Sequence, residues 1–411
     1  MIKRHLSSAV AEALKDTPVV LLVGARQTGK STLVNSLLGT APIRRYLTFD
    51  DQGVRDAARS DPAGFLAGLE GPVTLDEVQK APELFPAMKA VVDRDRRPGR
   101  YLLTGSANAL MLPRLSESLA GRMEVQTLWP FSQGELKGRR ETYLEKVFQA
   151  KFSPKPSHGG GATAWPELAC LGGFPEIVAR ASAPRRRPWF RSYVATVLSR
   201  DARDLANIES LATLPRLLGL LASRTASLLN YADLSRTLGM PQSTLKRYMG
   251  LLQALFLFHP LPAWSSNLGQ RLIKSPKVLL SDTGLLAHLT GATPDKLRQD
   301  PTAAGHLLEN FVAMELVKQA SWSETQVQVF HFRTLTGTEV DILLEDEEGR
   351  VVGIEVKASA TPSSSDFKGL KSLAECAENK FVRGIVLYTG SEVIPFGKNL
   401  TAVPLPALWE S

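Results

Sequence analysis

Runs of consecutive apolar residues, separated by segments with the apolar spacing of helices, recur through the first third of the chain. The clearest run is VVLLV at residues 19–23, and later runs lie at 46–49, 71–77, 100–108 and 123–128. Short apolar runs bounded by glycine or acidic residues are typical of strands buried on both faces of a parallel sheet. The pattern predicts an α/β domain over residues 1–140, in which strand 100–108 can lie between the first and third strands.

The pattern changes twice in the remainder of the chain. Residues 151–161 are rich in turn formers and predict an exposed loop, and helical spacing follows. Beyond residue 300 the predicted order is a helix at 305–320, strands at 328–332, 340–344 and 351–356, a helix at 365–377 and a strand at 384–388. A chain of 411 residues is too long for one hydrophobic core. After the first domain we therefore expect a linker and helical lid segment at 141–200, a helical module at 201–300 and a second α/β domain at 301–411.

The stretch GARQTGKST at residues 24–32 fits the pattern G-x-x-x-x-G-K-[ST], directly after the first predicted strand and at the start of a helix. The two glycines allow successive N–H groups to turn around an anion, and the helix adds its positive N-terminal end. Lys30 would reach the β- and γ-phosphates, and the Ser31 hydroxyl would bind Mg²⁺. A simple glycine turn is the weaker alternative, because a strand and a helix flank the motif. The sequence therefore predicts a nucleotide-phosphate site made of Gly24, Ala25, Arg26, Gln27, Thr28, Gly29, Lys30, Ser31 and Thr32.

Two acidic residues, Asp76 and Glu77, end the predicted strand 71–77. Acids at the carboxyl end of a parallel strand lie beside the phosphate loop, at the edge of an open sheet. Asp76 would therefore bind Mg²⁺, and Glu77 would orient or polarise the attacking water. Such a pair is otherwise only a favourable helix start, an alternative that loses weight once a phosphate loop precedes it.

Polar residues near the later strands extend the predicted site. Strand 100–108 would place Thr104 or Ser106 near the γ-phosphate as a sensor. Arg122 directly precedes strand 123–128, and an arginine supplied to a neighbour's nucleotide can raise hydrolysis by roughly 10³–10⁵. A solvated arginine is an equally good interpretation of this position.

Four segments together resemble one prokaryotic group, the AAA-type ATP-binding proteins that carry a C-terminal domain of unknown function. The segments are residues 24–32 (GARQTGKST), 75–79 (LDEVQ), 102–106 (LLTGS) and 119–122 (LAGR), and residues 172–176 and 193–201 fit the same pattern. The resemblance spans nearly the whole chain. It implies a P-loop NTPase core of the AAA type that binds ATP with Mg²⁺ and hydrolyses it. A homo-oligomer that shares nucleotide sites through Arg122 is compatible with it.

Residues 231–252 have the spacing of a helix-turn-helix. The second helix would present a polar and basic face to solvent, made up of Ser243, Lys246, Arg247 and Tyr248. The extended stretches 256–264 and 271–281 would then form the wing of a winged-helix module. Such a face suits DNA, while packing against another domain is the alternative. The net charge of +8 also fits a phosphate-rich partner. The basic residues 185–187 predict a solvated turn before a helix at 189–198, with a nucleic-acid contact as the alternative.

Glu309, Asp341, Glu355 and Lys357 stand out in the last part of the chain. Strand periodicity puts Glu355 and Lys357 on one face. The pieces EVD at 339–341 and EVK at 355–357 resemble the signature of the PD-(D/E)xK nuclease superfamily, which implies a restriction-endonuclease-like α/β domain. Asp341 and Glu355 would then bind Mg²⁺, Glu309 would complete the shell, and Lys357 would position the attacking water. A cross-strand ion pair is the alternative, and a fold that has lost its chemistry but kept DNA binding is another.

The remaining composition narrows the class of protein. Cys170 and Cys376 are the two cysteines, and their distance in sequence argues against a zinc site and a disulfide framework. We expect no secretory or membrane-spanning segment and therefore a cytoplasmic location. The favoured function is ATP hydrolysis coupled to action on DNA, with metal-dependent nuclease activity as one form of that action. An ATP-switched regulator that binds DNA or protein through an inactive nuclease fold is the alternative, and a metabolic kinase is least favoured.

Overall fold

The computed structural model describes residues 2–38, 44–106, 119–156, 164–205, 212–267, 269, 271 and 274–410. The chain divides into two compact units. The first contains Met1–Pro130, Tyr193–Glu209 and Gly250–Leu257, and the second contains Phe131–Ser192, Ser210–Met249 and Phe258–Ser411. None of the helices in the described part of the chain is long and apolar enough to cross a lipid bilayer.

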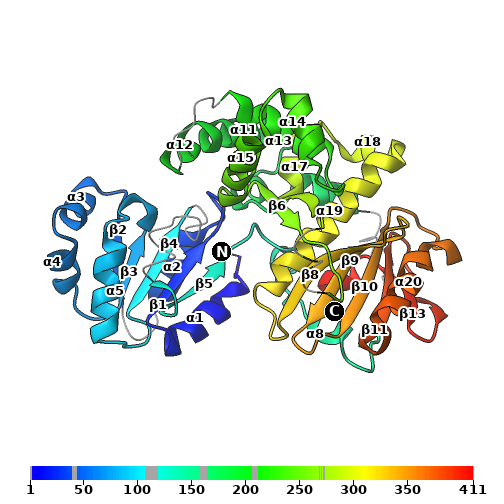
Figure 1. The fold of residues 1–411 in the computed structure, drawn as a ribbon, viewed down its shortest axis with the longest axis horizontal. Helices are drawn as coiled ribbons and strands as arrows, with labels where there is room; N and C mark the ends of the chain where they lie inside the picture. The colour runs from blue at the N-terminus through cyan, green and yellow to red at the C-terminus, as the bar shows by residue number, and fades with distance from the viewer. Residues whose placement is uncertain are drawn as a thin grey trace. The chain divides into compact units, whose positions relative to one another are not determined.

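A parallel sheet forms the centre of the first unit (Figure 1). Its strands, in the spatial order β2-β3-β4-β1-β5 over the described residues, are β2 (Arg45–Thr48), β3 (Val73–Asp76), β4 (Tyr101–Gly105), β1 (Val19–Val23) and β5 (Met123–Thr127). Every residue of β1 is buried, as the run VVLLV predicts. The predicted position of β4 between β1 and β3 is confirmed, although residues 107 and 108 of the predicted strand lie outside the described residues. The carboxyl ends of β1, β3 and β4 therefore meet at one edge of the sheet.

Helices accompany this sheet. They are α1 (Leu6–Asp16), α2 (Lys30–Leu38), α3 (Gln52–Ser60), α4 (Pro62–Ala67), η1 (Val78–Lys80), α5 (Leu84–Arg94), the π-helical turn η3 (Val197–Asp201) and α12 (Ala202–Leu205). The start of α4 follows its sequence signals, because Asp61 accepts a hydrogen bond from the Gly64 N–H and Pro62 occupies the first turn.

The second unit begins with helices and a short hairpin. The helices that belong wholly or mostly to it are α7 (Gln133–Lys137), α8 (Tyr143–Val147), α9 (Trp165–Leu171), α10 (Pro175–Val178), α11 (Ala183–Thr196), α13 (Thr213–Ser223), α14 (Tyr231–Leu238), α15 (Gln242–Ala254), α17 (Thr283–Thr290) and α18 (Pro294–Gln299). The last residues of α11 and α15 belong to the first unit. Strands β6 (Phe258–Leu261) and β7 (Lys277–Leu280) pair in antiparallel fashion. The two helices predicted for residues 231–252 are thus present, and a two-stranded sheet follows them. Residues 157–161 of the predicted loop lie outside the described residues.

Two local predictions in this region are wrong. Residues 185–187 lie inside α11 and not in a turn, because that helix begins at Ala183 and continues through Pro188. Tyr248 is buried and not exposed, whereas Ser243, Lys246 and Arg247 are exposed as predicted. Residues three and four apart share one face of a helix, so Tyr248 falls beside the buried residues Leu245 and Leu252.

A mixed sheet forms the end of the second unit, drawn in orange to red in Figure 1. Its strands are β8 (Val327–Arg333), β9 (Glu339–Asp346), β10 (Val351–Lys357), β11 (Phe381–Tyr388), β12 (Ile394–Gly397) and β13 (Leu400–Pro404), in the order β12-β13-β11-β10-β9-β8. The accompanying helices are α19 (Pro301–Ala320), η4 (Ser364–Phe367), α20 (Lys368–Ala377), η5 (Glu378–Lys380) and α21 (Ala407–Glu410). The sequence prediction missed β12 and β13, because both contain proline and β12 ends in glycine. The predicted alternation holds in β10, where Glu355 and Lys357 line the same pocket.

Candidate functional site: a nucleotide loop and a carboxylate pocket

The loop between β1 and α2 has a main chain that side chains would block. Gly24 has a φ of +156°, and a Cβ atom there would lie 2.2 Å from the Leu128 carbonyl oxygen. Gly29 has a φ of +92°. Glycine is the residue that tolerates both the left-handed angle and the close approach. Because α2 begins at Lys30, the loop ends at a helix N-terminus, which favours an anion.

Lys30 lies across this loop. Its Nζ donates hydrogen bonds to the carbonyl oxygens of Gly24, at 2.9 Å, and Ala25, at 3.0 Å. Burial lowers the pKa of Lys30 to about 8, although the nearby charges of Glu77 and Asp76 oppose the shift. The ammonium group thus has carbonyl partners, and a phosphate would provide a full opposite charge.

Asp76 is the centre of the polar cluster at the end of β3. Its carboxylate accepts a hydrogen bond from the Tyr46 hydroxyl at 2.7 Å and another from Thr104. The Ser31 Oγ lies 3.4 Å from both Asp76 oxygens. Burial and the hydrogen bond to Asp76 raise the pKa of Tyr46, so Tyr46 stays a neutral donor. Ser31 and Asp76 therefore present oxygen atoms side by side, as Mg²⁺ requires.

Glu77 follows Asp76 in a strained backbone conformation. Its φ of +61° lies in the left-handed region, which is uncommon for residues other than glycine and marks functional positions. Its N–H donates to Thr104 Oγ1 at 3.1 Å, and its carboxylate accepts from the Gln79 amide, which also donates to Ser106 Oγ at 3.0 Å. Thr104 and Ser106 thus lie beside the acids, and Gln79 orients the carboxylate.

A segment distant in sequence reaches the same loop. Arg26 forms an ion pair with Asp201 at 2.8 Å, and Asp201 ends the π-helical turn η3. π-Helical turns are rare and frequently lie at functional sites. A hydrogen bond from Lys80, with smaller contributions from Arg26 and Arg200, lowers the pKa of Asp50. The segment 193–201, whose role the sequence left open, therefore contacts the nucleotide loop through Asp201.

The other predicted residues of this region are placed as follows. Ala25 and Thr28 are buried, while Gln27 and Thr32 are exposed. Arg122 pairs with Asp93 at 2.5 Å and 3.1 Å. It precedes Met123, which pairs with Val19 at the start of β1, so Arg122 lies at the edge of the sheet opposite the loop. Arg122 thus cannot serve the nucleotide site of its own subunit.

This site fits ATP with Mg²⁺. The cradle excludes a Cβ atom, and Ser31 and Asp76 converge. Among the described residues, the loop cation has carbonyl partners but no carboxylate at hydrogen-bond distance. Lys30 and the loop N–H groups would hold the phosphates, and Ser31 and Asp76 would hold the metal ion.

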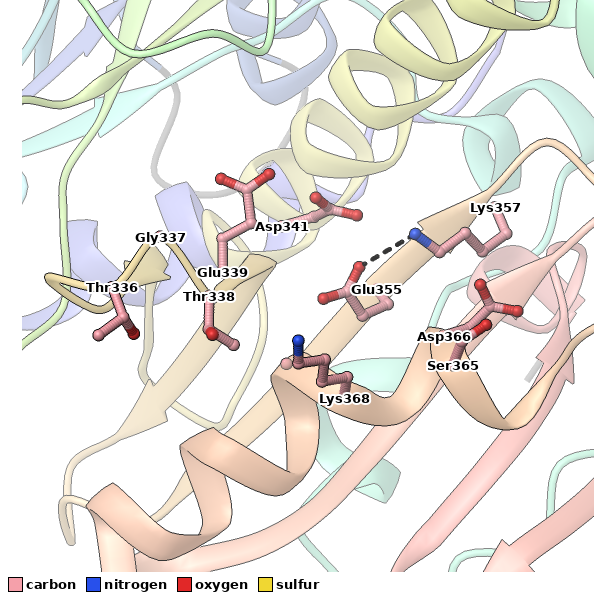
Figure 2. A pocket seen from close by; sticks show the side chains of 11 residues that line it. Thr336, Gly337, Thr338, Glu339, Asp341, Glu355, Lys357, Ser365, Asp366 and Lys368 are labelled. Atoms are coloured by element: carbon pink, nitrogen blue, oxygen red, sulfur yellow. Dashed lines mark ion pairs between the residues drawn. The ribbon is translucent and has the colours of Figure 1, made fainter.

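A second candidate site lies between β9, β10 and α20 (Figure 2). This pocket has a volume of about 360 Å³, and its charged lining residues are Glu339, Asp341, Glu355, Lys357, Asp366 and Lys368. The Lys357 Nζ lies 3.4 Å from Glu355 Oε2. α20 approaches closely because residue 369 is glycine, and a Cβ there would lie 2.0 Å from the Glu339 carbonyl oxygen. The structure therefore brings Asp341, Glu355 and Lys357 together, as the sequence predicts.

Glu309 pairs with a lysine and does not line the pocket. Its carboxylate accepts a hydrogen bond from Lys277 at 2.6 Å, and Lys277 also lies 3.6 Å from Asp341. Within the described residues, no group of three or more His, Cys, Asp or Glu side chains is arranged to hold a metal ion. The metal shell of Glu309, Asp341 and Glu355 therefore stays a prediction, and Lys277 lies where Glu309 would meet the ion.

Burial sets the protonation of these carboxyl groups. Burial and the Asp341 charge raise the pKa of Glu309 to about 8, against the effect of Lys277. Burial and Asp341 likewise raise the pKa of Glu355 well above its usual range. The contact of 2.6 Å between Lys277 and Glu309 has the length of a charge-assisted hydrogen bond, so we assign that pair as ionised. We assign Glu355, whose pKa is raised by burial and by the Asp341 charge, as the protonated carboxyl group.

Several residues of both sites were not predicted from the sequence. Tyr46, Gln79 and Lys277 belong to this group. Gln79 had a usable signal, because it ends the motif LDEVQ. Tyr46 begins the predicted strand 46–49 and Lys277 lies in a stretch interpreted as a wing, so neither had one.

Three parts of the chain match models of known protein families. Residues 16–137 match the family model of an AAA domain. Residues 162–296 match a domain of unknown function, DUF8612, and residues 304–408 match another, DUF4143. Over 403 residues the chain is 31% identical to two uncharacterized proteins, Mb2031c of Mycobacterium bovis and Rv2008c of Mycobacterium tuberculosis; each match covers 98% of this chain and 83% of the relative. The chain belongs to their family. It is an AAA-type ATPase with a C-terminal DUF4143 domain.

Solved structures similar to this AAA-type ATPase include the Walker-type ATPase PABY2304 of Pyrococcus abyssi. That likeness has a TM-score of 0.46 at 16% identity and covers 71% of this chain and 96% of the other. The RuvB Holliday junction branch migration motor of Thermotoga maritima is similar with a TM-score of 0.31 at 16% identity, over 64% of this chain and 90% of the motor. Because both TM-scores lie below 0.5, the assignment rests on the family models and the relatives, and not on these structures.

Proposed function

We propose that this protein binds ATP with Mg²⁺, hydrolyses it, and uses the cycle to control action on DNA. The observation that supports hydrolysis most strongly is the convergence of Lys30, Ser31, Asp76 and Glu77 at one edge of a parallel sheet. These groups divide the chemistry among them, since Lys30 binds phosphate, Ser31 and Asp76 hold the metal, and Glu77 orients water. Bound Mg²⁺ would neutralise phosphate charge.

The geometry of this chain supports the role of Glu77 in particular. The Gln79 amide donates a hydrogen bond to the Glu77 carboxylate, and the Thr104 hydroxyl accepts one from the Glu77 backbone N–H. A carboxylate held in this way can accept a hydrogen bond from a water molecule without first losing side-chain entropy. The same Thr104 hydroxyl donates a hydrogen bond to Asp76. A shift of the Asp76 carboxylate on metal binding would therefore be transmitted to the Glu77 backbone through this hydroxyl group.

The decisive variant is Glu77→Gln. We expect ATP turnover to fall by about 10²–10⁴-fold, while the affinity for ATP stays within a few-fold of wild type. Glu83→Gln, which removes an exposed glutamate from the same unit, is the control and should leave turnover unchanged. Wild-type turnover in Glu77→Gln would remove the role proposed for this residue, and absence of ATP binding in the folded wild type would remove the proposal itself.

DNA is the proposed partner of the second unit. Lys246 and Arg247 are exposed on α15, as is Ser243, the second residue of that helix. Recognition helices present such residues to DNA. The double variant Lys246→Ala/Arg247→Ala should weaken DNA binding and reduce its salt dependence, by about one unit of slope for each phosphate that the protein no longer neutralises. Lys89→Ala/Arg94→Ala, which removes two exposed charges from α5, is the matched control. Equal effects in both double variants would exclude α15 as the DNA-binding surface.

Metal-dependent cleavage of DNA is a second candidate function. It is supported by the pocket in which Asp341, Glu355 and Lys357 converge. We expect plasmid cleavage with Mg²⁺ or Mn²⁺ that Asp341→Ala and Lys357→Ala abolish. If wild type and both variants leave plasmid intact while still binding DNA, the alternative of an ATP-switched regulator with an inactive nuclease fold is favoured.

A shared nucleotide site is a further part of the proposal. Because Arg122 lies opposite the loop in its own subunit, it can meet a γ-phosphate only in a neighbouring copy. Arg122→Ala should therefore lower turnover only under conditions in which the protein assembles, as mass measurement with ATP would reveal. If wild-type protein that is diluted until it is monomeric keeps the turnover of the assembled protein, this role of Arg122 is contradicted.

A further inference from the structure

A buried ammonium group lies among the carboxylates behind the C-terminal pocket. Lys277 is the first residue of β7, and its Nζ lies 2.6 Å from Glu309 Oε1 and 3.6 Å from Asp341 Oδ1. The residue is 3% exposed, so water cannot replace these partners. The two carboxylates belong to α19 and β9, and one lysine therefore joins three elements.

The main chain holds Lys277 in this position from two sides. Lys277 pairs with Leu261 across the β6–β7 hairpin, and it forms an isolated bridge with Leu228. The preceding Pro276 accepts a hydrogen bond from the Leu229 N–H at 2.8 Å. The backbone of Lys277 is therefore fixed, and burial beside Glu309 and Asp341 holds its side chain.

A divalent cation between Glu309 and Asp341 would need the same oxygen atoms. Mg²⁺ binds its oxygens at about 2.0–2.1 Å and demands a near-octahedral arrangement. The Lys277 ammonium group already lies between the carboxylates, and its charge repels another cation at this distance. Asp341 and Glu355 face the pocket, whereas Glu309 and Lys277 do not line it.

We propose that Lys277 takes the place of a metal ion between Glu309 and Asp341. Glu309 is then a positioning residue for Lys277 and not a metal ligand. Of the three predicted metal ligands, Asp341 and Glu355 then remain as the pair that can hold a cation, so we expect at most one divalent cation in the pocket. This inference goes beyond the proposed function, because it fixes the number of cations and holds whether or not the pocket cleaves DNA.

Counting bound Mn²⁺ tests the inference. The measurement uses the full chain without nucleotide, in an Asp76→Asn background that removes the metal-binding carboxylate of the nucleotide loop. Free Mn²⁺ is followed by electron paramagnetic resonance during titration. We expect Lys277→Met to bind one more Mn²⁺ per chain than the same background with Lys277.

Lys318→Met is the matched control. Lys318 is also buried and also pairs with a glutamate of α19, Glu315, at 2.7 Å, but its second partner is the Phe131 carbonyl oxygen at 3.0 Å. Because no second carboxylate of the described residues pairs with Lys318, its removal should add no ion.

An unchanged Mn²⁺ count in folded Lys277→Met would overturn the inference, as would two ions in the pocket of the protein that retains Lys277. If Lys277→Met does not fold, Glu309→Gln decides. We expect Glu309→Gln to keep the parent Mn²⁺ affinity. A loss of about tenfold or more, the size of effect seen when support for a bound metal is removed, would identify Glu309 as part of a metal site and end the proposal.

Discussion

Lys30 in the nucleotide loop and Lys277 behind the C-terminal pocket are both buried ammonium groups, but their partners differ. Lys30 contacts the carbonyl oxygens of Gly24 and Ala25, while Lys277 contacts the carboxylates of Glu309 and Asp341. Burial lowers the pKa of Lys30 to about 8. The two carboxylates overcome burial at Lys277 and raise its pKa.

This difference separates a site prepared for a ligand from a site that is balanced within the chain. At the loop, the described residues place no full counter-charge within hydrogen-bond distance of Lys30, and a triphosphate would supply it. At the pocket, Lys277 and Lys357 already offset carboxylates, and the raised pKa of Glu355 lets a proton offset another. The first site gains from an incoming anion, while the second has less need of an incoming cation.

Removing the Lys30 charge tests the loop most directly. We expect Lys30→Met to lower kcat/KM for ATP by at least about 10²–10³-fold, the cost of losing one donor aimed at developing charge. Steady-state ATPase assays measure this effect. Lys15→Met, an exposed lysine of α1 that pairs with Glu12, is the control. If Lys30→Met loses no more kcat/KM than Lys15→Met, the comparison between the two buried lysines fails.

The pH dependence of ATP binding tests whether Lys30 lacks a carboxylate partner, unlike Lys277. Only the protonated Lys30 attracts phosphate, and its pKa in the free protein is about 8. Above that pH the ammonium group is lost, so ATP affinity should fall by about tenfold per pH unit and binding should take up a proton. Calorimetry in buffers of different ionisation enthalpy measures the proton. Equal heats in all buffers at pH 9 would contradict this assignment, and Lys30→Met should lack the dependence.

The ion pair between Arg26 and Asp201 tests whether a remote segment supports the loop. We expect Asp201→Asn and Arg26→Gln each to lower kcat/KM for ATP by about 3- to 30-fold, and the double variant to lose no more than either single one. This result would show that the two residues act together. Losses that multiply in the double variant would mean that Asp201 acts on something other than Arg26.

Glu355→Gln should have the smallest effect of these variants. It should stabilise the protein, whereas the variants above lower ATPase activity or ATP binding. The pKa of Glu355 in the folded protein is raised above the ordinary value of 4.5, so its contribution to stability is greatest at low pH and is lost as the pH rises. Glutamine cannot ionise and should raise the melting temperature of the metal-free protein near pH 8 by about 2–4 °C, equivalent to about 1 kcal/mol. Glu375→Gln, on the exposed side of α20, is the control. A lower melting temperature in Glu355→Gln would refute the assignment.

Features that depend on residues close together in the sequence were predicted more accurately than features that depend on distant residues. The loop 24–32 was predicted, because contiguous residues fix a glycine turn, a buried strand and a helix start. The position of β4 between β1 and β3 was predicted as well. Tyr248 was predicted on the exposed face of its helix but is buried, and the turn predicted at 185–187 is helix. In both places the packing of neighbouring elements decides between local alternatives of similar energy.

By itself, the sequence determined the phosphate loop, the acids after β3 and the alternation that puts Glu355 and Lys357 on one face. These features depend on backbone geometry within a few residues. Tertiary structure alone decided that Asp201 meets Arg26, 175 positions away, and that Lys277 meets Glu309, 32 positions away. Such contacts depend on how separate helices and strands pack, and no local pattern of residue types encodes which distant charge will be buried beside which.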